Sequence, residues 1–277
     1  MFDNQPGLSS AKQTKLNQLR DEIKNLKKVC VAYSGGVDSS LVAAIAKEQL
    51  GTNAIAVTGV SSALAPELLI EARKQALWLG IKHKECKTNE IEDPTYKNNS
   101  QNRCFACKKE LHSQLKVIAK AAKGFKVIDG VNHDDLFDYR PGIKAAKEAG
   151  ALSPLAKLKI NKLTVREFSK ALNLPWWDKP AQPCLASRFP YGESINIAGL
   201  ERVAKAEEWL KKVGFKKVRV RTHGSLAKIE IPEYEIDSFL ELSRKEIVSF
   251  FIEIGFTSVS LDLEGLISGK LNREDNA

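Results

Sequence analysis

A glycine turn between an apolar run and a helical segment constrains this chain most. Residues 34–40 read Ser-Gly-Gly-Val-Asp-Ser-Ser, after the apolar residues 29–33 and before the apolar residues 41–46. The pattern predicts a buried strand, a tight turn and the first turn of a helix. Glycines let successive N–H groups converge, and a helix N-terminus adds unpaired donors and the positive end of its dipole. Such a turn favours a phosphate group as its ligand.

The motif also indicates which phosphate chemistry to expect. The turn lacks the lysine of a Walker A loop, and no Gly-x-Gly-x-x-Gly signature of dinucleotide binding follows a strand. Ser-Gly-Gly-x-Asp-Ser instead resembles the PP-loop of the ATP pyrophosphatases, which cleave ATP between its α- and β-phosphates. The residues expected to bind ATP and its pyrophosphate are Ser34, Gly35, Gly36, Asp38, Ser39 and Ser40.

A Mg²⁺ ion bound with ATP would take one or two carboxylates in addition to phosphate oxygens. Asp38 is the first candidate, both as a ligand and as a participant in catalysis, and Asp129 is the second. The alternatives are structural: a helix N-cap for Asp38 and a strand-end turn for Asp129.

Strands and helices alternate along the first two thirds of the chain. This order predicts an α/β fold, a parallel twisted sheet with helices on both faces, with a Rossmann-like PP-loop architecture. Ligands of such sheets bind at the C-terminal ends of the strands. Strands are expected at 29–33, 54–58, 81–86 and 126–130, and helices at 9–28, 66–79 and 108–122 and directly after the glycine turn.

Residues 174–193 interrupt this order with four prolines and two adjacent tryptophans, which predicts an irregular loop. After it, the pattern indicates a small α+β domain. We therefore expect a PP-loop domain at 1–193, including the cysteine loop 174–193, and a small domain for substrate binding or oligomerisation at 194–277. Its helices are expected at 197–213, 233–242 and 244–254, and its strands at 217–221, 227–231 and 258–261.

Composition limits the compartment and the partners. The 277 residues contain no apolar stretch near the roughly 20 residues of a membrane span. The first ten residues do not read as a secretory signal, and five cysteines, an odd number, do not suggest a disulfide framework. A cytoplasmic location is expected, with Cys30 and Cys86 packed inside strands. The net charge of +9 fits a small anionic substrate and a solvated lysine surface better than nucleic acid.

Three other cysteines offer sulfur or metal chemistry. Cys104 and Cys107 form Cys-x-x-Cys, and Cys184 lies in the proline-rich loop. Three thiolates are the minimum for a [4Fe–4S] cluster with one open iron. Zinc would need a fourth ligand, which His112 could supply, and an isolated Cys-x-x-Cys also suits a redox dithiol. Structural thiols are the remaining alternative.

Several segments resemble those of the LarE family of ATP-dependent sulfur transferases and occur in the same order along the chain. The resemblance runs from about residue 10 to about residue 270. The most specific are Pro-Cys-Leu-Ala-Ser-Arg at 183–188 and Arg-x-Arg-x-His-Gly at 219–224. The segments that carry the resemblance are 34–39, 129–135, 139–142, 153–155, 183–193 and 218–224.

The resemblance implies an activity in making the nickel-pincer nucleotide cofactor. Members adenylate the carboxylates of pyridinium-3,5-biscarboxylic acid mononucleotide and convert them to thiocarboxylates. In some members the cysteine matching Cys184 gives up its sulfur and becomes dehydroalanine. Others carry three cysteines and hold a [4Fe–4S] cluster that relays sulfide, and Cys104 and Cys107 imply this type. Homo-oligomers, hexamers among them, and a sulfide or other sulfur donor are the implied partners.

The substrate phosphate needs cationic ligands. Arg219 and Arg221 alternate on one predicted strand and so face one side, where their forked donors suit a phosphate. We expect Ser187 and Arg188 to bind substrate beside Cys184, with Cys184 and Arg188 also taking part in catalysis.

Two glutamates and two tryptophans are expected to have structural roles, and three other functions are alternatives to sulfur transfer. Glu207 and Glu208 are expected to face solvent, and Trp176 and Trp177 are expected to pack rather than to stack on a ring. The alternatives are a tRNA thiolase with an iron–sulfur cluster, an amidating synthetase, and a nucleotide-binding module without catalysis.

Overall fold

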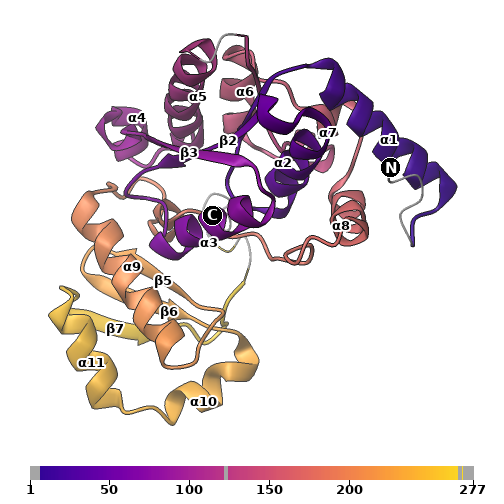
Figure 1. Cartoon of the computed structure of the whole chain (residues 1–277). Coiled ribbons are helices and arrows are strands. Elements are labelled where there is room, and N and C mark those ends of the chain that lie inside the picture. The colour runs from indigo at the N-terminus through magenta and orange to yellow at the C-terminus, as the bar shows by residue number, and fades with distance from the viewer. Residues whose placement is uncertain (1–6, 122–123, 268–269, 271–277) are drawn as a thin grey trace. The chain divides into compact units, whose positions relative to one another are not determined.

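The protein, a computed structural model shown in Figure 1, is described for residues 7–121, 124–267 and 270. It divides into two compact units. The first contains Met1–Ser61, Pro66–Glu90 and Cys104–Gln182, and the second contains Ser62–Ala65, Ile91–Arg103 and Pro183–Ala277.

The second unit therefore takes in residues 183–193, which the sequence pattern assigns to the PP-loop domain. Backbone hydrogen bonds explain the difference. The N–H of Leu185 donates to the carbonyl of Ala63 at 2.9 Å, and the N–H of Gly192 donates to that of Asn99 at 3.1 Å. Proline-rich backbone thus finds its partners in chain segments distant in sequence.

A four-stranded parallel sheet organises the first unit (Figure 1). Its strand order is β3-β2-β1-β4, so β1 lies between β2 and β4. The strands are β1 Val29–Ala32, β2 Ala54–Val60, β3 Lys82–Lys87 and β4 Lys126–Ile128. The helices of this unit are α1 Ser10–Asn25, α2 Val37–Leu50, α3 Pro66–Trp78, α5 Arg103–Ala121, α6 Pro141–Glu148, α7 Pro154–Lys157 and α8 Lys162–Ala171, with short helices η1 Gly51–Asn53, η2 Glu90–Glu92 and η3 Asp134–Leu136. The last two residues of η2, like Arg103, belong to the second unit.

The central strand β1 is buried on both of its faces, as the alternation of its side chains shows. Val29 and Val31 pack into the core formed with α1, α2 and α8, whereas Cys30 packs into a smaller cluster with Leu115 of α5. Successive residues of a strand point to opposite faces, so each apolar strand serves two helical layers. The α/β architecture predicted from the sequence is confirmed, and Cys30 and Cys86 are buried.

The second unit is a small α+β arrangement. β5 and β6 form an antiparallel hairpin that turns at Gly224, and β7 pairs with β6 in parallel. Its elements are α4 Pro94–Lys97, η4 Leu185–Arg188, α9 Ile197–Lys212, β5 Arg219–His223, β6 Leu226–Glu230, η5 Glu233–Glu235, α10 Ile236–Leu240, α11 Arg244–Glu253 and β7 Ser258–Leu261. In the described residues, no helix combines the length and apolar character needed to cross a bilayer.

One glycine fixes how closely β4 and α2 approach. A Cβ built at Gly130, just after β4, would lie 2.6 Å from the backbone nitrogen of Ser39 and 2.9 Å from the carbonyl carbon of Asp38. Since backbone atoms cannot swing aside like a flexible side chain, any larger residue must displace the first turn of α2.

Gly130→Ala is therefore expected to lower the free energy of unfolding by about 1–3 kcal/mol and to weaken ATP binding together with stability. Chemical denaturation and ATP titration measure the two effects. Gly150→Ala is the control, because an added Cβ there meets no atom within 4 Å and only the strain of its φ of +82° is tested. Equally small losses of unfolding free energy and of ATP affinity in both variants would contradict a steric clash at Gly130.

Candidate active site

The glycine turn links the end of β1 to α2. Gly35 has a φ of +71°, and a Cβ built there would lie 3.2 Å from the Cβ of Ala72 on α3. The N–H of Ser34 donates to the Ser39 hydroxyl at 3.2 Å, and the N–H of Gly36 donates to the Ser34 hydroxyl at 3.3 Å. A left-handed backbone against a helix requires glycine, and the serine hydroxyls hold the rest of the turn.

The N-terminus of α2 carries no side-chain cap, because Gly36 occupies the N-cap position. The N–H groups of Val37, Asp38 and Ser39 lie in the first turn, where a helix provides no acceptor. The helix dipole adds positive potential at the same place. This part of the turn has the donors and the potential that a phosphate group requires.

Ser40 differs from the other serines of the turn. It is fully buried, and its hydroxyl donates to Gln75 Oε1 at 3.1 Å. The Tyr33 hydroxyl donates to the same oxygen at 3.0 Å, and burial raises the pKa of Tyr33 to about 12. This hydroxyl, which the motif predicts to bind phosphate, instead links α2 to α3, because position 40 faces inward on the helix.

Carboxylates gather at the C-terminal ends of β1 and β4. Asp38 Oδ1 accepts a hydrogen bond from Asn132 Nδ2 at 2.9 Å. Burial raises the pKa of Asp129 and that of Asp135. Within the described residues, no group of three or more His, Cys, Asp or Glu side chains is arranged to hold a metal ion. A Mg²⁺ ion at this edge would therefore rely on phosphate oxygens for part of its coordination.

The Cys-x-x-Cys pair lies on a helix. α5 begins at Arg103, five residues before the expected start, so Cys104 and Cys107 are one helical turn apart and share a face. Cys104 is exposed, and Cys107, which is half-buried, donates from Sγ to Glu90 Oε1 at 3.9 Å. His112 is buried, and burial lowers its pKa to about 4. The thiols of Cys104 and Cys107 are accessible and could supply two ligands of a cluster. The imidazole of His112 is buried and so is not exposed beside them as a further ligand.

Cys184 lies in the second unit, immediately before η4, and is exposed. Its carbonyl accepts hydrogen bonds from the Ser187 hydroxyl at 2.8 Å and from Arg188 Nη1 at 3.3 Å. The main chain of the cysteine loop is therefore fixed at the point where the thiol is accessible. This combination suits a thiol that must carry sulfur or bind a metal.

Two buried ion pairs hold this loop. Arg188 donates from Nε and Nη2 to the two carboxylate oxygens of Glu207, at 2.7 and 2.9 Å. Arg221 is paired with Glu230 and also donates from Nη1 to the carbonyl of Ser187 at 3.1 Å. Both guanidinium charges are thus neutralised inside the protein, and both arginines anchor the backbone next to Cys184.

Arg219 is the exception among these arginines. Burial and the positive charges of Arg188 and Arg221 lower its pKa. No carboxylate among the described residues forms an ion pair with Arg219, although Glu230 and Glu207 contribute attraction at longer range. A half-buried guanidinium next to two others is suited to an anionic ligand.

Glu207 was expected to face solvent, and this prediction was wrong. It is 2% exposed, whereas the neighbouring Glu208 has a side chain that is 59% exposed. The spacing of the buried residues Leu200, Val203 and Leu210 on α9 already placed Glu207 on the apolar face. A carboxylate within an apolar stripe was the signal for a buried ion pair.

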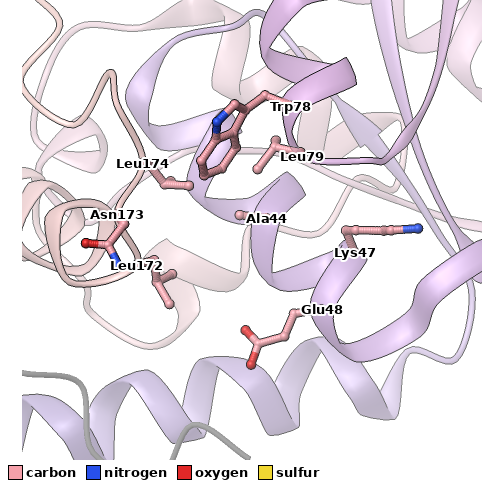
Figure 2. A pocket seen from close by; sticks show the side chains of 8 residues that line it. All are labelled: Ala44, Lys47, Glu48, Trp78, Leu79, Leu172, Asn173 and Leu174. Atoms are coloured by element: carbon pink, nitrogen blue, oxygen red, sulfur yellow. The ribbon is translucent and has the colours of Figure 1, made fainter.

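The tryptophans of the cysteine loop pack within the first unit. Trp176 meets Trp78 edge-on, with 5.3 Å between ring centroids, and the Lys170 ammonium lies 4.8 Å from the centre of Trp177. Trp78 also lines a pocket of about 320 Å³ (Figure 2). Lys47 and other residues at the C-terminal end of α2 form its wall, whereas the glycine turn lies at the opposite end of that helix.

Glu207→Ala is expected to destabilise the second unit by about 3–5 kcal/mol, since it leaves the buried Arg188 without its counter-charge. Glu208→Ala, which removes an exposed pair with Lys212, should change stability by less than about 1 kcal/mol. Chemical denaturation followed by far-ultraviolet circular dichroism measures both. Similar values for the two variants would contradict the role of the buried pair.

Comparison with known proteins gives matches over most of the chain. A family model described as NAD synthase matches residues 12–129. An uncharacterized protein of Synechocystis sp. is 54% identical over 262 residues, 94% of this chain and 98% of the relative. An uncharacterized protein of Methanocaldococcus jannaschii is 33% identical over 253 residues, 90% of this chain and 94% of the relative.

A third relative has a named activity. The pyridinium-3,5-bisthiocarboxylic acid mononucleotide synthase of Lactiplantibacillus plantarum is 37% identical over 260 residues, which cover 94% of each chain. The match covers 94% of this chain, and so it includes residues of both units. The chain therefore belongs to the family of this synthase, the LarE family of ATP-dependent enzymes built on a PP-loop domain.

Proposed function

We propose that this protein is an ATP-dependent sulfur transferase that converts the carboxylates of pyridinium-3,5-biscarboxylic acid mononucleotide to thiocarboxylates. The observation that carries the proposal is the exposed Cys184 on a backbone held by Arg188, in a chain whose glycine turn is open to phosphate. The match to the Lactiplantibacillus plantarum synthase supports the same substrate.

The first step activates a carboxylate. A substrate oxygen attacks the α-phosphorus of ATP, the bond between the α-phosphorus and the bridging oxygen breaks, and pyrophosphate leaves with the electron pair. The uncapped N–H groups at the start of α2 are suited to bind the phosphates. Asp38, with Asp129 as a second candidate, would hold Mg²⁺ together with phosphate oxygens.

The second step exchanges oxygen for sulfur. A hydrosulfide attacks the acyl carbon of the adenylate, the bond to the AMP oxygen breaks, and one proton is released with AMP. The substrate phosphate would bind Arg219, because this arginine has no carboxylate partner in ion-pair contact among the described residues. Arg188 and Arg221 would act by positioning the loop that carries Cys184 and Ser187.

The resemblance implies that Cys104, Cys107 and Cys184 would hold a [4Fe–4S] cluster, although among the described residues they do not form a ready three-ligand group. Their thiols are exposed or half-buried, in contrast to Cys30 and Cys86, which are buried in the sheet. When bound through three thiolates, such a cluster offers one open iron to an added sulfide. Sulfide is therefore the proposed donor, and single use of the Cys184 sulfur is the alternative.

Cys184→Ala is expected to abolish thiocarboxylate formation while pyrophosphate release from ATP continues, because the glycine turn is untouched. Anaerobic incubation with ATP, Mg²⁺, sulfide and the biscarboxylate nucleotide, followed by mass spectrometry, measures both. Cys86→Ala is the control, as this thiol is buried in the sheet. Thiocarboxylate at the wild-type yield from Cys184→Ala would refute the assignment.

Anaerobically purified protein is expected to be brown with about four irons per chain. Cys104→Ser and Cys107→Ser should each lose the iron and the visible absorbance, measured by iron assay and spectroscopy. A colourless, iron-free enzyme that turns over repeatedly would contradict the cluster. Loss of one H₂S from Cys184 for each thiocarboxylate formed would identify single use instead, and salt-sensitive tRNA binding would favour a tRNA thiolase.

A further inference from the structure

A lysine from a distant part of the chain lies at the glycine turn. Lys179 Nζ donates to the carbonyl oxygen of Gly35 at 3.3 Å, although 144 positions separate the two residues. The same ammonium forms an ion pair with Glu71 Oε2 at 2.7 Å, and the side chain of Lys179 is only 12% exposed. The first unit therefore places a nearly buried positive charge against a turn that contains no basic residue of its own.

The backbone of Lys179 is fixed on both sides. Its N–H donates to the carbonyl of Trp176 at 3.1 Å, and its own carbonyl accepts from Arg166 Nη2 at 3.0 Å. Trp176 in turn packs against Trp78. Because both peptide groups next to Lys179 are held, only its flexible four-carbon stem is free to adjust the position of the ammonium.

The counter-charge of Lys179 belongs to the framework of the turn. Glu71 Oε1 accepts from Gln75 Nε2 at 3.2 Å, and Gln75 Oε1 accepts from the hydroxyls of Tyr33 and Ser40. This connected set links the ammonium to the end of β1 and to α2. Glu71 is itself more than one third exposed, so an incoming anion can compete with it for the lysine.

A lysine ammonium has three donors, and two are used by Gly35 and Glu71. The N–H groups of the turn provide hydrogen bonds but no full charge. When the bond between the α-phosphorus and the bridging oxygen of ATP breaks, negative charge accumulates on the pyrophosphate oxygens. A preorganised cation therefore stabilises the transition state more than it stabilises bound ATP.

We infer that Lys179 is a phosphate-binding residue for the β- and γ-phosphates of ATP and for the leaving pyrophosphate, and so supplies the cation that the glycine turn lacks. The inference rests on the proposed function, because that function supplies the adenylation step in which pyrophosphate leaves. In the adenylation step Lys179 stays protonated and donates hydrogen bonds to the pyrophosphate that receives the electron pair.

The test compares pyrophosphate with AMP, which lacks the β- and γ-phosphates. Isothermal titration calorimetry of the full chain should show that Lys179→Gln weakens pyrophosphate binding by about ten- to hundredfold and leaves AMP affinity within about twofold. Lys179→Arg should restore part of the affinity. Lys157→Gln, which breaks another lysine–glutamate pair of the same unit, is the control.

Glu71→Gln separates a phosphate-binding role from a purely structural one. If Lys179 binds phosphate, this variant keeps pyrophosphate affinity near the wild-type value, since a competing carboxylate has been removed. Equal losses in Glu71→Gln and Lys179→Gln, or a matching loss of AMP binding, would overturn the inference in favour of a structural ion pair.

Failure of the Lys179 inference can be told apart from failure of the proposed function. Wild-type protein that forms thiocarboxylate while Lys179→Gln binds pyrophosphate normally would refute the lysine alone. Pyrophosphate binding that depends on Lys179, in a protein that forms no thiocarboxylate, would refute the substrate assignment and leave the lysine in place.

Discussion

Backbone packing around the glycine turn is the constraint on which the phosphate site depends. Gly130 after β4 lies against the first turn of α2, and Gly35 lies against Ala72 of α3. A Cβ at Gly130 would collide with main-chain atoms of α2, and a Cβ at Gly35 would press against Ala72, so close packing of the backbone fixes the start of α2. Its N–H groups are held in place before any ligand arrives, and preorganised donors need no rearrangement when charge develops.

The cysteine loop is held by a different kind of interaction. Its prolines and lack of periodicity give it little regular secondary structure beyond η4, and two buried arginine–glutamate pairs fix its backbone. Burying such pairs costs desolvation, which makes them a poor source of stability compared with apolar packing. Their value here is positional, because guanidinium groups reach the carbonyls of Cys184 and Ser187 and leave the thiol exposed.

Much of the architecture could be predicted because it follows from local patterns. Alternating apolar strands and amphipathic helices indicated the parallel sheet, and the Ser-Gly-Gly-x-Asp-Ser turn indicated the phosphate site. The inward role of Ser40 and the burial of Glu207 were missed, because both depend on which helix face meets a neighbour. The early start of α5 was missed, although Asn102, directly before Arg103, is a residue type favoured at helix N-caps.

The sequence alone determined the residue types and the order of the elements: an apolar strand, a glycine turn, a thiol loop and alternating arginines. Only the tertiary structure decided which charges are already neutralised and which remain available. Arg188 and Arg221 are paired with glutamates, whereas Arg219 has no such partner among the described residues, and Lys179 reaches Gly35 across 144 positions. Side-chain pairing depends on distances in space, and these arise only when the chain folds.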